Sequence, residues 1–303
     1  MVIPAYRARD TIARVMQALE PQILGAGREV VIVESGSADT GAWLRSRWPW
    51  ARVLSIEQRL LPGQARNRGA SIAEGDRLAF LDADAVPQPG WLDELELALG
   101  PGVEIVAGAV LNGTPASIWG TIAYLLEFLD WDPDGPGAPW HAAGCNLLLE
   151  RAALERMGGF PEDLWPGEDT VLSAPLARSG VLAFAPRACV AHLNRKHWRT
   201  VLAHQRRLGA AWVAICERET VPGTRLLKPP VATWTGAGRV LAVMRQLRSY
   251  PDAVRRFVPR APLLLLGILA WSFGVAQYSR SKGPRTHDDF GHPHQDLRRT
   301  NRL

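Results

Sequence analysis

Apolar runs and segments of helical periodicity alternate along the first hundred residues. The runs are rich in Val, Ile and Leu and occupy residues 1–5, 28–34, 53–56 and 78–81. Between them, apolar side chains recur every three or four residues, as in the helix that Asp10 is expected to cap, in 64–74, and at Trp91, Leu92, Leu95 and Leu97. This alternation predicts βαβ units, and hence an α/β fold whose mainly parallel sheet has helices on both faces.

The pattern is less regular in the second hundred residues. We expect helices at 117–128, 151–157, 168–178 and 198–219, and strands at 144–149, 182–185 and 189–193. The segment 130–139, rich in Pro, Gly and Asp, predicts a loop. The α/β domain is therefore expected to extend over residues 1–220.

Residues 261–278 form an uncharged, strongly apolar segment. Its length of 18 residues is near the lower limit for a membrane-spanning helix, which needs roughly 17–25 residues. Five arginines precede the segment and four basic residues follow it, so charge gives no orientation. An interfacial helix, a re-entrant hairpin and a buried domain helix are alternatives. We expect a basic linker with amphipathic helices at 221–260, a membrane-associated or transmembrane helix at 261–278, and a basic tail at 279–303.

Composition narrows the class of protein. The hydrophobic share of 47% and the charged share of 21% are those of an ordinary folded chain. The net charge of +5, concentrated late in the chain, favours anionic lipid or phosphate over nucleic acid as a partner. Three widely spaced cysteines indicate a reduced, cytosol-facing domain. The first residues lack the apolar core of a signal peptide, and a strand is under way at residue 2, so we expect the natural start slightly earlier.

Two acidic residues follow the apolar run at 78–81. Asp82 and Asp84 are separated by one small residue, and alternate residues of extended backbone point the same way. Because ligands bind at the carboxyl ends of such strands, both carboxylates are expected to share a divalent cation there. Mg²⁺ or Mn²⁺ in this position would neutralise a diphosphate leaving group. Taken alone, the tripeptide also fits a solvated turn.

Three other segments accompany the acidic pair in a fixed order. Residues 2–6 (VIPAY) end the first run, 31–39 (VIVESGSAD) end the second, and 63–69 (GQARNRG) open the helix before the acidic strand. This ordered set resembles the family-two class of inverting glycosyltransferases, of the membrane-associated bacterial type, over about residues 1–220. The resemblance implies the GT-A nucleotide-diphospho-sugar transferase fold, a divalent metal cofactor and a nucleoside-diphosphate sugar donor.

On the nucleotide side, the resemblance assigns contact with the nucleobase to Ala5 and Tyr6. Glu34 occupies the position where the family usually has a base-binding Asp. The longer side chain keeps the acceptor charge and adds a methylene, which leaves the identity of the base open.

The resemblance implies further donor contacts. Arg66 is expected near the nucleotide, and Asp76 and Asn146 near the donor sugar. Asp82 is expected to face the ribose and the metal, with Asp84 as a direct metal ligand.

The second half of the chain carries the acceptor side of the resemblance. Residues 158–169 contain GGF followed by an acidic pair, which implies Asp169 as the general base and Glu168 as a residue that orients it or binds acceptor. Adjacent acids before a helix also compensate its dipole. His192 matches a position that supplies a third metal ligand in many relatives, although a lone His is more often structural.

Together these features predict a hexosyltransferase-type enzyme that moves one sugar per turnover, with inversion, to an acceptor hydroxyl. The apolar segment favours a lipid-linked or cell-envelope acceptor at the cytoplasmic face of the membrane. A catalytically silent membrane-bound scaffold is an alternative. A sugar nucleotidyltransferase is a weaker one, because its Gly-rich N-terminal loop is absent, and a basic nucleic-acid-binding protein is the weakest.

Overall fold

The computed structural model describes residues 1–135, 137–219 and 258–280. The predicted linker and tail lie almost entirely outside these residues. The strands are β1 (Val2–Tyr6), β2 (Val31–Ser35), β3 (Arg52–Ile56), β4 (Arg77–Leu81), β5 (Ala85–Pro87), β6 (Ile105–Asn112), β7 (Asn146–Glu150) and β8 (Leu182–His192). The helices are α1 (Arg9–Ile23), α2 (Ala38–Arg47), α3 (Pro62–Ile72), α4 (Trp91–Ala98), α5 (Ile118–Glu127), α6 (Arg151–Arg156), α7 (Glu168–Arg178), α8 (Trp198–Arg218) and α11 (Ala261–Arg280).

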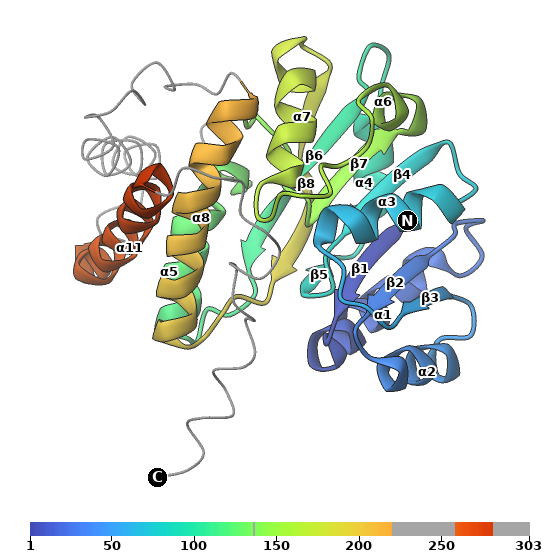
Figure 1. Cartoon of the computed structure of the whole chain (residues 1–303). Coiled ribbons are helices and arrows are strands. Elements are labelled where there is room, and N and C mark those ends of the chain that lie inside the picture. The colour runs from blue at the N-terminus through green and yellow to red at the C-terminus, as the bar shows by residue number, and fades with distance from the viewer. Residues whose placement is uncertain (136, 220–257, 281–303) are drawn as a thin grey trace.

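These strands form an eight-stranded mixed sheet with the order β3-β2-β1-β4-β7-β6-β8-β5 (Figure 1). β3, β2, β1 and β4 are parallel, as are β6 and β8, whereas β7 is antiparallel to both its neighbours and β5 is antiparallel to β8. The direction of strand addition reverses between β1 and β4. In open α/β sheets such a reversal marks the crevice where ligands bind.

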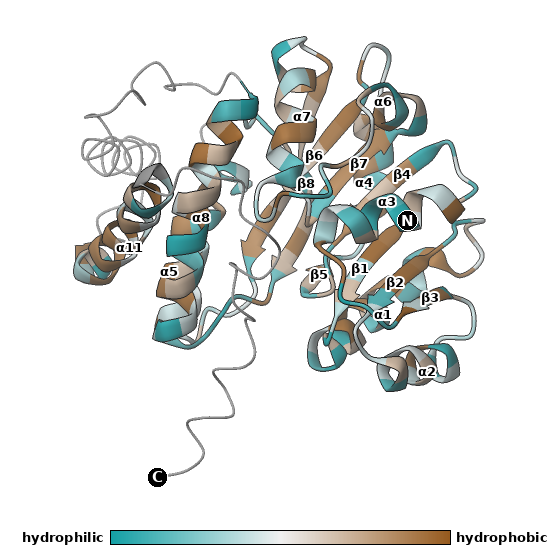
Figure 2. Cartoon of the chain, viewed as in Figure 1, coloured by the Kyte–Doolittle hydropathy of each residue, from teal (hydrophilic) through white to brown (hydrophobic). Residues whose placement is uncertain are grey.

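The helices cover both faces of this sheet. Right-handed crossovers place α1 and α2 on one face and α3 on the other, because strand addition changes direction after β3. α4 lies on the face of α1, where Asp93 pairs with Arg28 at 2.5 Å. All five residues of β2 are buried, as expected for a strand covered on both sides. Figure 2 shows the apolar residues concentrated on the central strands and along α11.

Most of the predicted elements are present, and the differences have physical causes. The hydrophobic pattern does not predict α2, whose buried positions are few, or β5, which has three residues. It also does not predict β6, whose centre is the small-residue segment Ala107–Ala109. The two strands predicted at 182–193 are one strand, β8, with an irregularity where its register to β6 shifts. Asp10 lies in the first turn of α1 and does not cap it, and Leu97 is exposed on α4.

A layer of three helices stands beside the sheet. α11 packs along α8 and also contacts α5 (Figure 1). Among the described residues, Val258–Tyr278 is the one helical stretch long and apolar enough to cross a membrane, and 33% of its most apolar window is buried against the chain. The predicted apolar helix is therefore confirmed as a helix, and one of its sides belongs to the domain.

Close packing of α3 on the sheet yields a stability prediction. A Cβ on Gly69 would overlap side-chain methyl groups of Val2 and Val33. Gly69→Ala should therefore lower the free energy of unfolding by about 1–3 kcal/mol through overpacking, although alanine alone favours a helix by about 1 kcal/mol. Urea unfolding measures the change. Gly100→Ala is the control, because a Cβ there meets nothing within 4 Å; equal effects of the two substitutions would contradict the packing argument.

Candidate active site

The predicted donor residues gather where the sheet reverses. Ala5 and Tyr6 end β1, Glu34 is paired with Ala5 near the end of β2, and Asp82 directly follows β4. Parallel strands have their carboxyl ends at the same edge of the sheet, so these side chains lie close together although they are far apart in the sequence. The structure thus brings together the segments that the sequence analysis assigns to the nucleotide.

Glu34 is a buried acid awaiting a partner. Its relative exposure is 0%, and neither carboxylate oxygen has a hydrogen-bond partner among the described residues. Burial raises the pKa of Glu34 to about 7, against the opposing effects of the Ser37 backbone and Arg45. Buried polar groups normally find partners, so an unpaired one at the ligand edge of a sheet indicates a group that a ligand satisfies.

Aromatic rings and arginines extend the site from Tyr6 towards α7. The Arg59 guanidinium lies 4.8 Å from the centre of the Tyr6 ring and 6.0 Å from that of Trp165. The Arg207 guanidinium also lies over the Trp165 ring, 4.9 Å from its centre. Burial and the nearby charges of Arg195, Arg59 and Arg206 lower the pKa of Arg207 to about 10. Positive charge is therefore concentrated between Tyr6, at the end of β1, and Trp165, in the loop before α7.

Arg66 joins the two halves of the site. Its guanidinium donates to Glu168 Oε1 at 2.5 Å and to Asp82 Oδ1 at 2.7 Å, and its side chain is 3% exposed. Gly144 leaves the space that this group needs, because a Cβ there would lie 2.7 Å from Nη2. Burial opposes the charge of Arg66, but Asp82, Glu168 and Asp169 outweigh it and raise its pKa.

Strand pairing brings His192 to Asp84. β5 follows the acidic turn and pairs with the end of β8, so that Ala85 lies opposite His192. The Nε2 atom of His192 is 3.5 Å from Asp84 Oδ1. The Nδ1 atom contacts Asn194 Oδ1 at 3.0 Å, and the Asn194 amide nitrogen donates to three oxygens. Asn194 Oδ1 therefore accepts and His192 Nδ1 donates, which fixes the ring with its Nε2 atom facing Asp84.

This arrangement fits a divalent metal. One carboxylate and one imidazole nitrogen converge, and an outer-shell amide fixes the ring, which is the usual support of a metal-binding His. Among the described residues no three His, Cys, Asp or Glu side chains already converge in a ligating group. Asp82 instead directs one oxygen at Arg66. Oxygen ligands from a bound diphosphate would complete the set, as in other sites where Mg²⁺ or Mn²⁺ is held jointly by protein and phosphate.

Asp169 and Glu168 occupy the first turn of α7 in different environments. Asp169 Oδ2 accepts from the Gly144 backbone at 2.7 Å and Oδ1 accepts from the Thr170 backbone at 2.7 Å. Its side chain is partly exposed. Glu168 is buried, and burial, aided by Asp169 and opposed by Arg66, raises its pKa to about 7. Of the two acids, Asp169 is thus fixed in orientation yet reachable, whereas Glu168 is occupied by Arg66.

Two predicted donor residues are placed elsewhere. Asp76 precedes β4 and is exposed at the end opposite Asp82, a strand length of roughly 20 Å away, so the structure does not bring it to the predicted donor edge. Asn146 is completely buried: its Oδ1 accepts from Trp91 and its Nδ2 donates to two backbone carbonyls. Its hydrogen bonds hold the core together, which leaves no amide group for a sugar.

A second polar cluster, which the sequence does not predict, lies beside His192. Glu127 ends α5 and accepts from Gln205 at 3.0 Å, with His204 Nε2 at 3.3 Å. Burial disfavours its charge, but His204, Arg195 and His192 prevail and lower the pKa of Glu127 to about 2. In the sequence, the one sign of this contact is that polar residues occupy buried positions of the helical patterns of α5 and α8. The contact attaches α8 to the candidate active site.

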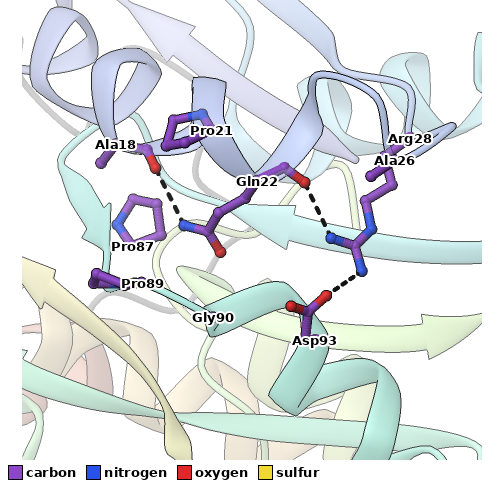
Figure 3. A pocket seen from close by; sticks show the side chains of 9 residues that line it. All are labelled: Ala18, Pro21, Gln22, Ala26, Arg28, Pro87, Pro89, Gly90 and Asp93. Atoms are coloured by element: carbon purple, nitrogen blue, oxygen red, sulfur yellow. Dashed lines mark hydrogen bonds and ion pairs between the residues drawn. The ribbon is translucent and has the colours of Figure 1, made fainter.

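A separate hollow lies between α1 and the start of α4 (Figure 3). Arg28 closes one side of it by contacts with Gln22 and Asp93. The remaining lining is small and mostly apolar, and none of the predicted site residues contributes to it. This hollow is therefore distinct from the candidate active site.

The buried acid yields a prediction about pH. The pKa of Glu34 rises from 4.5 to about 7 on folding. The folded state then keeps a proton that the unfolded chain releases, so stability falls as pH rises from about 4.5 through about 7. Relative to wild type, Glu34→Gln should gain up to about 3 kcal/mol in free energy of unfolding between pH 4.5 and pH 8. Urea titrations measure this, with exposed Glu57→Gln as control; a gain independent of pH would contradict it.

Comparison with solved structures identifies the fold. A mannosyltransferase from Pyrobaculum calidifontis, solved with GDP-Man and Mn²⁺, superposes with a TM-score of 0.62 over 93% of this chain and 87% of that chain, at 18% identity. Glucosyl-3-phosphoglycerate synthase from Mycobacterium tuberculosis, solved with Mn²⁺, UDP-glucose and phosphoglyceric acid, gives 0.52 over 72% and 79%, at 23% identity. The predicted GT-A fold is thereby confirmed.

Curated relatives are also glycosyltransferases. Pre-mycofactocin glycosyltransferase from Mycobacterium tuberculosis is 25% identical over 80% of this chain and 54% of its own length, so the chain spans about half of that relative. Glycosyltransferase AglE from Haloferax volcanii is 24% identical over 91% and 92%. The sequence signature described as Glycosyl transferase family 2 matches residues 1–156, more than half of the chain. The chain belongs to glycosyl transferase family 2.

Proposed function

We propose that the protein transfers one sugar from a nucleoside-diphosphate sugar to an acceptor hydroxyl, with inversion at the anomeric carbon. The observation that carries this proposal is the double contact of Arg66 with Asp82 and Glu168. One guanidinium group thus holds Asp82, at the proposed donor edge, close to Glu168, the neighbour of Asp169. Donor and acceptor groups are thereby fixed relative to each other, as a direct displacement requires.

The nucleotide is expected at the carboxyl ends of β1 and β2. Tyr6 offers a ring face to the base, and Glu34 offers an unpaired buried carboxyl group for the hydrogen-bond donors on the base edge. The solved neighbours hold GDP-Man and UDP-glucose. Uracil and guanine each present ring N–H groups that a carboxylate can accept, so UDP- and GDP-sugars are the donors to test first.

Asp84 and His192 are proposed to hold Mg²⁺ or Mn²⁺, with Asp82 facing the metal and the ribose. The bound ion supplies positive charge at the diphosphate, where negative charge develops as the leaving group departs. An imidazole ligand favours Mn²⁺ over Mg²⁺, since Mg²⁺ prefers oxygen. Arg59 and Arg207 add fixed positive charge from the protein itself.

Asp169 is proposed as the general base. Hydrogen bonds from the backbone of Gly144 and Thr170 hold its carboxylate, and partial exposure leaves it open to an acceptor. It takes the proton from the acceptor hydroxyl while that oxygen attacks the anomeric carbon and the nucleoside diphosphate leaves. Glu168, tied to Arg66, orients this carboxylate. A single displacement inverts the anomeric configuration.

The acceptor is proposed to carry a hydroxyl group at the cytoplasmic face of a membrane, on a lipid or a cell-envelope glycan. The apolar helix α11 beside α8 supports this choice. The single apolar helix found among the described residues is fewer than a channel for polymer export needs, which favours one sugar per turnover.

The metal site yields the test of this function. With UDP- and GDP-sugars and Mn²⁺, the purified protein should hydrolyse one donor class slowly. Asp84→Ala should lower that rate by about 100- to 1,000-fold, and His192→Ala should raise the Mn²⁺ concentration for half-maximal rate by about tenfold or more. Asp76→Ala is the matched control and should retain the wild-type rate. Folded wild-type protein that neither binds nor hydrolyses any donor would favour the silent scaffold instead.

The assignment of Asp169 is tested by Asp169→Asn. The amide keeps the shape of the side chain but cannot accept the proton, so turnover should fall by about 100- to 10,000-fold. Binding of the nucleoside diphosphate with Mn²⁺, measured by calorimetry, should stay close to that of wild type. A matching loss of binding would show that Asp169 shapes the site and does not act as the base.

A further inference from the structure

Helix α11 is apolar on two opposite sides. One side is buried and contains Leu264, Ile268, Trp271 and Val275. The other side is exposed: Leu265, Leu266, Leu269 and Phe273 have relative exposures of 49%, 46%, 64% and 59%. These four residues follow helical spacing, so they form one continuous stripe, here called the outer stripe. A contiguous apolar surface of this kind on a folded domain indicates an interaction site.

The inner side of α11 is fixed to the domain by close backbone contacts. A Cβ on Gly209 of α8 would overlap the Trp271 carbonyl group, and a Cβ on Gly274 would overlap that of Arg206. Small residues that admit such approach characterise tightly packed helix pairs. The Tyr278 hydroxyl also donates to Glu217 at 3.3 Å. α11 is therefore docked along α8, with the outer stripe facing away.

This docking makes a span across the bilayer energetically unfavourable. α11 has 20 residues and is roughly 30 Å long, so spanning would place the adjoining length of α8 in hydrocarbon. That helix carries Arg206, exposed beside Gly274, and the polar contacts of His204 and Gln205 with Glu127. Charged groups in the hydrocarbon core are costly and rare. The docked arrangement therefore favours the interfacial alternative for 261–278 over a transmembrane helix.

Charge around the outer stripe indicates the occupant. Arg260 directly precedes α11, and Arg206 of α8 is exposed where its backbone meets Gly274 of α11. In the sequence, residues 241–260 contain five arginines and one acidic residue. A helix with an apolar face and basic surroundings lies in the plane of the membrane interface, with its apolar face among the acyl chains and its cations at anionic headgroups.

We propose that α11 lies flat on an anionic bilayer surface, with the outer stripe inserted into the headgroup–acyl boundary, while its inner side stays docked on α8. The membrane then contacts the same helix layer that borders the candidate active site. The ring centre of Trp271 lies 6.3 Å from that of Trp212, which lies 6.2 Å from that of Trp140. Trp140 adjoins His141, on which the charge of Asp169 acts. The inference does not rest on the proposed transfer reaction.

The experiment is co-sedimentation of the full chain with vesicles. Wild type should bind phosphatidylglycerol–phosphatidylcholine vesicles at least about tenfold more tightly than pure phosphatidylcholine vesicles. The double variant Leu269→Glu, Phe273→Glu should bind the anionic vesicles at least about tenfold more weakly than wild type. Leu97→Glu is the matched control, because Leu97 is 72% exposed on α4, and it should bind as wild type does. Thermal unfolding confirms that each variant is folded.

Three outcomes would overturn the proposal. Wild type that ignores anionic vesicles, or binds both kinds equally, removes the membrane surface as the occupant. Retention in the vesicle pellet after alkaline carbonate extraction identifies a true span, because an interfacial helix is released. Light scattering that shows a dimer in wild type and a monomer in the double variant, without vesicle binding, assigns the outer stripe to a second copy of the chain. Release by carbonate together with loss of binding in the double variant supports the proposal.

Discussion

The buried guanidinium of Arg66 is the interaction on which the site depends. Two carboxylates from segments 86 residues apart, Asp82 and Glu168, meet across it. Removing one member of a buried ionic group costs about 3–5 kcal/mol, because the remaining charges lose compensation. Much of the surrounding structure serves this contact. Gly144 has no side chain where the guanidinium lies, and Phe160 supplies a ring face 5.3 Å from it.

The same contact explains the glycine-rich segment before α7. Gly158 and Gly159 have positive φ values of 77° and 83°, which most residues avoid. This turn lets the Phe160 backbone exchange hydrogen bonds with the Asn67 side chain on α3, one residue after Arg66. The helix that carries the arginine and the loop that leads to the acidic pair are therefore held together twice.

The sequence predicts the chemistry of single segments better than the contacts between segments that are far apart along the chain. The acidic pair at 82–84 and the pair at 168–169 follow from strand ends and a helix start, because those signals are local. Asp76 precedes β4 and therefore lies away from the carboxyl ends where ligands bind; its assignment came from the family resemblance and not from its place in the sequence. An asparagine amide can bind a sugar or core carbonyl groups equally well, and the sequence does not show that Asn146 is buried. β6 is not predicted because Ala107, Gly108 and Ala109 interrupt its Ile and Val residues, so it lacks the Val-, Ile- and Leu-rich run that marks β2 and β4. The Asp84–His192 contact, by contrast, needed the register of β5 with β8, which no spacing in the sequence reveals.

That register has a consequence for how the protein is assembled. Ala85 and His192 are neighbours in space and 107 residues apart along the chain. The acidic turn is complete early in the sequence, whereas its histidine arrives with the last strand of the sheet. Contacts of such separation form late in folding, because closing the intervening loop costs entropy before the contact rewards it. The metal site proposed at Asp84 and His192 is therefore complete only after β8 has paired with β5, which would couple metal affinity to a late step of folding.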